Sequence, residues 1–375
     1  MSKEMNLTKK LYQNFVVESV KKINKNELET GPLVVEFDPT AVCDLACPGC
    51  ISEDIIKLGS SFSRERIMSL GEEFIEAGVK AVILIGGGEP LAHPKIGDFM
   101  ELLGKNDIHI GITTNGTFID RYLDVIAKYS SWTRISMDAG TTETFKALRP
   151  TKGGKSKFDK IVDNMRVLAS VKKGKLGFSY LIQTEADGDN VINNIDEIYV
   201  AAELAKDIGC DYFEVKPTYN FRNDVAHSLM KHDVNEMNRA KKIIDMLDEL
   251  EDDNFKILKA INLKYSLNGV DKPQSKNYKK CPSTQLRTLV TPGGAYVCPY
   301  WRGKEHMKIG NVDTTSFSEM WKWSLRAEVM DDLDASKDCN FHCLRNDTNI
   351  EVLEMIELIK NNKEIESIPE FDRFI

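Results

Sequence analysis

The feature that most constrains the fold is a regular alternation of short apolar runs and longer amphipathic runs between residues 33 and 217. Each apolar run has the length of a strand and is followed by a helix or by a segment that contains one. Such alternation predicts a parallel sheet with helices outside it. Six units fall short of the eight that close a full barrel, so we predict an α/β fold built on a partial (β/α)6, TIM-like barrel. The expected strands are 33–37, 81–85, 108–113, 133–137, 176–182 and 212–215.

Amphipathic segments between these strands predict helices of ordinary length. The first is the clearest, because Ser63 suits its N-cap and Gly78 ends it. The expected helices are 63–77, 94–103, 119–129, 158–171 and 194–208.

The segments on either side of this alternation predict two further parts. Residues 8–26 place apolar side chains on one helical face, and a Gly-Pro pair at 31–32 ends this leader. After Pro217 the pattern changes to a charged helix over 235–251 and a polar linker over 268–280. We therefore expect a helical leader over 1–32, the barrel and its following helix over 33–270, and a smaller domain with a C-terminal helix over 271–375.

Charge and hydropathy exclude several classes of partner. The chain has 50 basic and 58 acidic residues, a net charge of −8, which argues against binding to nucleic acid. No apolar run approaches the roughly 18 residues that span a bilayer. The N-terminal segment also lacks the apolar core of a signal peptide, so we expect a cytoplasmic protein without a membrane partner.

The eight cysteines are unevenly distributed. Three lie between Cys43 and Cys50, four lie between Cys281 and Cys343, and Cys210 stands alone. Because disulfides are disfavoured in a reducing cytoplasm, clustered thiols suggest metal binding. Cys210 begins the sixth expected strand, and we interpret it as a small buried apolar residue.

The first cluster has the spacing C-x3-C-x2-C and closely follows the first expected strand. Three thiolates make a poor tetrahedral zinc site, because structural zinc takes four protein ligands. They suit a [4Fe–4S] cluster with one iron left open, which can chelate a small molecule. A zinc knuckle or an accidental cluster is the alternative.

With the motifs that follow, residues 33–217 resemble the radical S-adenosylmethionine (SAM) superfamily. Gly-Gly-Glu-Pro ends the second strand, Thr-Asn-Gly follows the third, and Ser-Met-Asp lies at the fourth. One position departs from the family, since Gly49 precedes the third cysteine where an aromatic residue is usual. The resemblance implies that the cluster is ligated by Cys43, Cys47 and Cys50, and that SAM is bound by Gly87, Gly88, Glu89, Pro90, Asn115, Ser136, Asp138 and Gln183.

The family's chemistry requires a substrate pocket near these residues. The resemblance implies a 5′-deoxyadenosyl radical that takes hydrogen from a substrate at the carboxyl ends of the strands. In the sixth strand, alternation predicts Phe213 and Val215 outside and Glu214 and Lys216 inside the barrel. With Arg149, the two inward residues are our candidate catalytic base or substrate clamp; a structural ion pair is the alternative.

The second cluster begins with Cys281-x11-Gly293-x4-Cys298 and ends with Cys339 and Cys343. Four thiols alone fit zinc or iron–sulfur. The spacing resembles the SPASM/Twitch extensions of radical SAM enzymes, as do Ile-Gly-Asn-Val at 309–312 and Met-Trp at 320–321. Four cysteines imply the Twitch form, with a second, fully ligated [4Fe–4S] cluster. The step from Cys339 to Cys343 is longer than the common two-residue spacing.

The resemblance implies an oxidoreductase with two [4Fe–4S] clusters and SAM. As in Twitch dehydrogenases such as 2-deoxy-scyllo-inosamine dehydrogenase, we expect a small-molecule substrate, namely a polyol, amino sugar or sugar-nucleotide. Its two-electron oxidation would use the auxiliary cluster as electron acceptor, and a flavodoxin- or ferredoxin-type protein would supply the initial electron.

Two alternatives stay open. The first is a maturase that cross-links or epimerises a ribosomal peptide, although residues 1–32 offer one helix rather than a leader-binding domain. The second is a non-catalytic iron–sulfur or zinc protein.

Overall fold

The barrel strands lie in one 10-stranded sheet. The computed structural model describes residues 8–25, 27, 31–184, 186–187, 190–191, 193–220, 228–229, 233–260, 262–268, 275–341 and 343–375. The sheet order is β11-β8-β5-β4-β3-β2-β1-β12-β13-β14, and every neighbouring pair from β11 to β12 is parallel. The strands are β1 (Val34–Phe37), β2 (Ala81–Leu84), β3 (His109–Thr114), β4 (Ser130–Ser136), β5 (Lys175–Ile182), β8 (Tyr212–Pro217), β11 (Lys256–Lys259), β12 (Arg287–Thr291), β13 (Gly294–Tyr296) and β14 (Lys308–Gly310).

This sheet confirms a partial TIM-like barrel and extends it. All six expected strands are present, in chain order from β1 to β8. A further parallel strand is added at each end, β11 beside β8 and β12 beside β1. The sheet therefore continues directly from the barrel into the C-terminal part of the chain.

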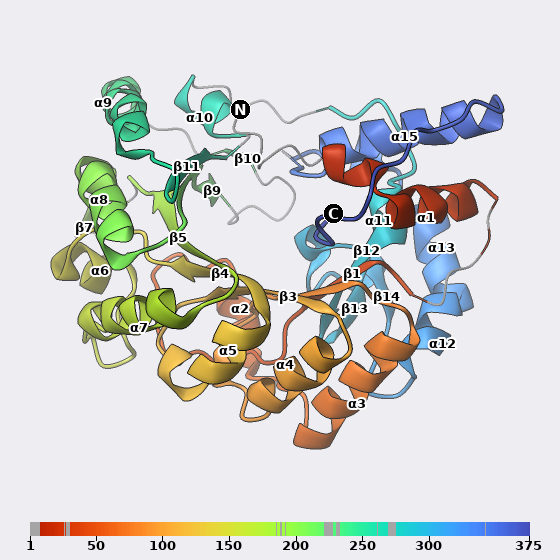
Figure 1. Cartoon of the computed structure of the whole chain (residues 1–375), viewed down its shortest axis with the longest axis horizontal. Coiled ribbons are helices and arrows are strands. Elements are labelled where there is room, and N and C mark those ends of the chain that lie inside the picture. Colours follow the sequence, from red (N-terminus) through yellow and green to blue (C-terminus); the bar gives the residue numbers. More distant parts are fainter. Residues whose placement is uncertain are drawn as a thin grey trace.

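Helices cover the outer, convex side of the curved sheet (Figure 1). Side chains alternate along β1, and Phe37 points outward, where its ring packs 5.6 Å from Phe74 and 5.1 Å from Phe99. Glu36 points the other way and lines an internal cavity. The outer helices are α3 (Arg64–Glu76), α4 (Ile96–Lys105), α5 (Leu123–Tyr129), α7 (Phe158–Val171), α8 (Ile198–Ile208) and α9 (Val234–Met246).

The expected leader helix is wrong in one respect, because it is broken at Gln13. Gln13 is extended, with φ −65° and ψ 143°. Its buried side-chain amide donates to the carbonyls of Lys10 and Asp372 and accepts from the N–H groups of Phe371 and Asp372. These long-range hydrogen bonds outweigh helix propensity and divide the segment into η2 (Lys9–Tyr12) and α1 (Asn14–Asn24).

Three other expected helices begin or end in a 3₁₀ turn. Such turns are common at helix ends. They are η4 (Ile119–Arg121) before α5, η5 (Ile195–Glu197) before α8, and η6 (Leu247–Leu250) after α9. The elements without a sequence prediction are short: α2 (Glu53–Leu58), η3 (Pro90–Ala92), α6 (Thr142–Leu148), α10 (Leu263–Leu267), and the hairpins β6 (Ala186–Asp187) with β7 (Asn190–Val191) and β9 (Tyr219–Asn220) with β10 (Ser228–Leu229).

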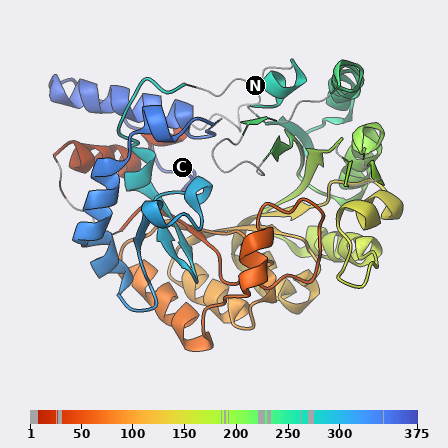
Figure 2. The ribbon, with the colours of Figure 1, turned by 180° about the vertical axis from the view of Figure 1, so that it is seen from behind.

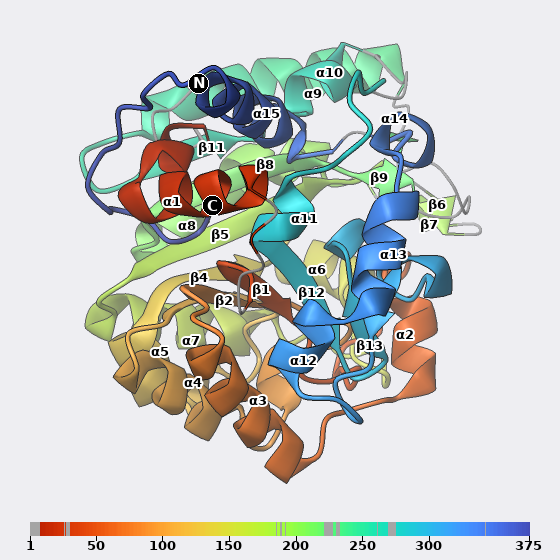
Figure 3. The ribbon, with the colours of Figure 1, turned by 90° about the vertical axis from the view of Figure 1, so that its right-hand side faces the viewer.

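The C-terminal part wraps around the open edge of the barrel beside β12. Helix α15 packs against α1, as Figure 3 shows. The expected boundary between residues 270 and 271 lies outside the described residues. None of the helices in the described ranges is long and apolar enough to cross a membrane. The elements are α11 (Ser283–Leu286), η7 (Pro299–Trp301), η8 (Glu305–Met307), α12 (Phe317–Lys322), α13 (Ser324–Asp332), α14 (Ala335–Asp338) and α15 (Asn346–Lys360).

Candidate functional site

The first cysteine loop lies at the carboxyl end of β1, between that strand and α2, on the side facing the viewer in Figure 2. Backbone hydrogen bonds join it to the Gly-Gly-Glu-Pro segment: Gly88 N–H donates to Thr40 O over 3.0 Å, and Glu89 N–H donates to Val42 O over 2.8 Å. On its other side, Ala46 N–H donates to Pro150 O over 2.7 Å. The fold therefore brings these two expected motifs into direct contact.

Gly88 is required by the closeness of this contact. A Cβ atom built at Gly88 would lie 2.4 Å from Val42 O and 2.5 Å from Ala41 C. These are backbone atoms of the residues just before Cys43, so a side chain here would push the cysteine loop away.

The three thiols of this loop suit metal ligation. Cys43, Cys47 and Cys50 are free and partly buried. Burial raises the pKa of Cys43 to about 12 and also raises the pKa of Cys47. Without a metal both would stay protonated near neutral pH, so binding of iron would release their protons. The donor set fits a cluster with one iron not ligated by cysteine.

Glu89 is held inside the site by its neighbours. It is 2% exposed, and its carboxylate accepts from Thr114 Oγ1 (2.5 Å), Leu91 N–H (3.0 Å) and Asn115 N–H (2.7 Å). Burial raises the pKa of Glu89 to about 7, against the effect of these hydrogen bonds. Asn115 in turn donates from Nδ2 to Asp44 of the cysteine loop over 2.9 Å. Glu89 and Asn115 thus tie the ends of β2 and β3 to the cysteine loop.

Asp138 and Arg149, which we assigned different roles, form an ion pair with each other. Asp138 has φ +57° and is 1% exposed; its Oδ2 accepts from Arg149 Nε over 2.9 Å and its Oδ1 from Leu181 N–H over 2.8 Å. Burial works against the charge on Arg149, but Asp138 outweighs it and raises the Arg149 pKa. Ser136 ends β4 and Gln183 follows β5, so both lie at the same end of the barrel.

Glu214 and Lys216 point into the barrel, as alternation along β8 predicts. Glu214 Oε2 lies 3.0 Å from Arg134 Nη1 on β4 and 3.5 Å from Lys216 Nζ. Burial opposes ionisation of Glu214, but Lys216 and Arg134 outweigh it and hold its pKa below the usual value. Phe213 and Val215 are buried on the other side of the strand.

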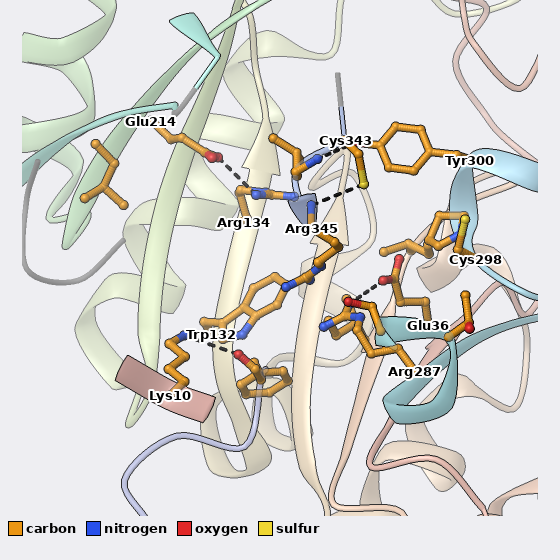
Figure 4. Close-up of a pocket in the computed structure, with 18 of the residues that line it drawn as sticks. Lys10, Glu36, Trp132, Arg134, Glu214, Arg287, Cys298, Tyr300, Cys343 and Arg345 are labelled. Atoms are coloured by element: carbon orange, nitrogen blue, oxygen red, sulfur yellow. Dashed lines mark hydrogen bonds and ion pairs between the residues drawn. The ribbon is translucent and has the colours of Figure 1, made fainter. Parts of the chain in front are cut away.

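A cavity of about 610 Å³ joins this charged group to the second cysteine cluster (Figure 4). Its size falls within the range of ligand pockets. One wall is formed by the inner face of the barrel, with Glu36, Trp132, Arg134 and Glu214. The opposite wall carries all four thiols of the extension: Cys281, Cys298, Cys339 and Cys343. The lining does not include the SAM motif residues named above.

The four thiols of the extension influence one another electrostatically, and burial raises the pKa of Cys281 to about 12. Asn349 Nδ2 lies 3.2 Å from Cys281 Sγ, and Arg345 N–H lies 3.4 Å from Cys343 Sγ. N–H groups directed at sulfur are a usual feature of iron–sulfur ligands. Within the described ranges, no three His, Cys, Asp or Glu side chains are placed to hold a single metal ion.

An ion pair connects the two cysteine-bearing parts. Asp38, at the carboxyl end of β1, binds Arg302 of the extension through Oδ2 to Nε (2.7 Å) and Oδ1 to Nη2 (3.0 Å). Burial raises the pKa of Asp38 to about 6, while Arg302 acts in the opposite direction.

Several residues of the site lacked a role in our sequence predictions. Asp38, Asp44 and Arg302 act through partners far away in the chain, so no local pattern marks them. Arg134 differs from these residues, because alternation along the fourth strand predicts that it shares a face with Ser136 and Asp138.

We expect Gly88→Ala to destabilise the fold by about 1–3 kcal/mol and to lower iron incorporation, because the added methyl group meets backbone atoms. Chemical denaturation and iron analysis of the purified protein would measure both effects. Gly153→Ala is the matched control, since the nearest atom to its Cβ lies at 4.0 Å. Equal stability and iron content in the two variants would refute the close-contact argument.

The sequence and the fold of this chain are similar to those of known proteins. Residues 37–193 match the model of the radical SAM superfamily. Molybdenum cofactor biosynthesis protein 1 of Dictyostelium discoideum is 32% identical over 36% of this chain and 22% of its own length. The chain therefore spans about a fifth of that relative.

Two other proteins match most of the chain. Mycofactocin maturase MftC of Mycobacterium tuberculosis is 22% identical over 78% of this chain and 71% of its own. The crystal structure of Streptococcus suis SuiB bound to precursor peptide SuiA covers 95% of this chain and 79% of that chain, with a TM-score of 0.60 and 15% identity. Residues 37–193 therefore match a radical SAM domain, and the fold of the chain, with its extension included, is similar to that of SuiB.

Proposed function

We propose that this protein is a radical SAM maturase that carries out a two-electron oxidation on a residue of a ribosomally made peptide. The observation that carries this proposal is the extent of the similarity. The relative of cofactor biosynthesis matches 36% of the chain, whereas the maturase MftC and the peptide-bound SuiB match 78% and 95%. The similarity in fold to the peptide-bound SuiB therefore extends over the part of the chain that carries the second set of cysteines.

This proposal replaces the small-molecule substrate expected from the sequence. That expectation used the short segment before the barrel as evidence against a peptide. The comparisons give no support to a polyol or sugar, and SuiB aligns over nearly the whole chain despite the short segment. The oxidation and the electron acceptor remain part of the proposal, while the substrate class changes.

The cavity supports a peptide residue as the reacting group. It lies between the inner strand face and the second cysteine cluster, and its walls include the aromatic side chains of Trp132, Tyr300 and Phe341. Aromatic walls bury an amino-acid side chain with a large apolar contact area.

The proposed chemistry divides between the bound groups and the chain. When bound, the first cluster and SAM supply a radical that removes a hydrogen atom, and the second cluster accepts the remaining electron from the substrate. The chain must then take up one proton. We assign this role to Glu214, which lines the cavity and is kept ionised by Lys216 and Arg134. Arg149, which we expected to be a base or substrate clamp, would instead have a positioning role through its ion pair with Asp138 beside the first cysteine loop.

Two further parts of the proposal follow from the same chemistry. The seven clustered cysteines would hold two [4Fe–4S] clusters, one open to SAM and one fully ligated. The electron that starts each turnover must come from outside the chain, and we propose a small flavodoxin- or ferredoxin-type protein as its source.

A peptide substrate is testable by anaerobic co-expression with each short reading frame that neighbours the gene. We expect one peptide to lose the mass of two hydrogen atoms, as read by mass spectrometry. The control is the triple variant C43A/C47A/C50A, with which every peptide should keep its mass. Unchanged peptides, together with oxidation of a polyol or amino sugar by the reconstituted enzyme, would overturn the proposal.

Glu214→Gln should lower peptide oxidation by about 10²–10⁴-fold, because the amide cannot accept the proton. Formation of 5′-deoxyadenosine from SAM should continue, and both products can be quantified in one chromatogram. Glu351→Gln offers a control on a carboxylate outside the cavity lining. If Glu214→Gln oxidises the peptide at the parental rate, the ion pairs of Glu214 with Arg134 and Lys216 are structural.

Iron and acid-labile sulfide analysis of reconstituted protein tests the cluster count. Two four-iron clusters predict about eight of each per chain, and Cys281→Ala together with Cys298→Ala should leave about four. About four iron with one zinc in the parent protein would contradict the second cluster.

A further inference from the structure

Three arginines contribute to the wall of the cavity, and they differ in how their charges are compensated. Arg134 is paired with Glu214. Arg287 binds Glu36 and the carbonyl of Ile375. Arg345 has no carboxylate within ion-pairing distance among the described residues, and its Nη1 is buried without a hydrogen-bond partner.

An arginine in this state has a strong tendency to bind an anion. Arg345 is partly buried, and its Nη1 has lost its contact with water without gaining a hydrogen-bond acceptor, which is costly for a charged group. Glu36 is the carboxylate that most favours the charge on Arg345, but it already binds Arg287. The positive charge of Arg287 in turn disfavours the charge on Arg345. The guanidinium matches a carboxylate in shape, since two parallel N–H groups can bind both oxygens.

The position of Arg345 indicates that its side chain acts on a group inside the cavity rather than on the cysteines. Its backbone N–H donates to Cys343 Sγ, while its side chain lines the cavity and influences Cys343 only through its charge. A separate cation, Lys276, influences Cys281, Cys339 and Cys343 and donates to the carbonyls of Cys339 and Phe341. Figure 4 shows Arg345 between Cys343 and the inner-strand residues Trp132 and Arg134. Arg345 also immediately precedes α15, so its backbone is fixed by a long helix.

We infer that Arg345 binds a carboxylate of the substrate and thereby holds the reacting residue between the barrel face and the second cysteine cluster. This inference rests on the proposed function, because it assigns a carboxylate to the peptide that enters this cavity. A carboxylate can come from an acidic side chain or from the end of a peptide, and the chemistry of recognition is the same.

Binding of small carboxylates to the anaerobic holoenzyme tests the inference without the native peptide. The probes are N-acetylglutamate α-amide, with a side-chain carboxylate; N-acetylglutamine, with a terminal carboxylate; and neutral N-acetylglutamine amide. Calorimetry should detect one or both acids and not the neutral amide. Arg345→Gln should weaken that binding by about 10- to 100-fold. Arg345→Lys should recover part of it, because the charge remains but the two-pronged geometry is lost.

Lys337→Gln is the matched control, since it removes an exposed charge two residues from Cys339, outside the cavity lining. It should leave acid binding unchanged. The potential of the second cluster, followed by electron paramagnetic resonance during a redox titration, separates the competing role. If Arg345→Gln shifts that potential and leaves acid binding at the parental level, the charge serves the cluster and the inference is overturned. Equal binding of the acids and the neutral amide to the parent protein would also overturn it.

These outcomes are distinct from failure of the proposed function. Acid binding that depends on Arg345, with no peptide oxidised, would retain the carboxylate site and reject the maturase. Peptide oxidation with the same KM in the parent and in Arg345→Gln would retain the maturase and reject the carboxylate site.

Discussion

The parallel pairing of β1 with both β2 and β12 is the interaction on which the arrangement of the protein depends. On one side, β1 aligns with the strand that leads into Gly-Gly-Glu-Pro. On the other, it aligns with the strand that follows Cys281 and leads through β13 to Cys298. Because β1 pairs in register with both β2 and β12, it fixes the two sets of cysteines relative to the same sheet. The extension is thus a continuation of the barrel's hydrogen bonding.

The inner face of that sheet is unusual for a protein interior in the density of its charges. Glu36, Arg134, Glu214 and Lys216 all point inward from the barrel strands. Buried charges are costly unless they are paired, and all four of these have a partner of opposite charge. These ion pairs hold the charged groups in fixed positions on the inner face of the sheet, where a substrate in the cavity can reach them. A chemistry that generates a radical, a proton and an electron in one place gains from such fixed groups.

Much of the barrel could be predicted from local pattern, because its causes are local. The inward position of Glu214 and Lys216 follows from the twofold period of a strand with Phe213 and Val215 outside. The strand β11 has only four residues, two of them lysines, and is therefore too short and too polar to be predicted from its pattern. The helix α2 was not predicted because its apolar side chains do not pack into a core; Leu58, for example, is 79% exposed. Gln13 and Arg345 take their roles from residues that meet them only after the chain has folded.

The ion pair between Asp38 and Arg302 gives the two halves a mechanical connection. Asp38 directly follows β1, and its Oδ2 would lie 3.4 Å from a Cβ atom built at Gly87, so it lies beside the segment implied in SAM binding. Arg302 follows Cys298 by four residues, and its Nη1 also reaches Ser52 beside the first cysteine loop, at 3.5 Å. One arginine from the second cysteine-bearing part therefore holds the chain on both sides of the first cysteine loop, before Cys43 and after Cys50.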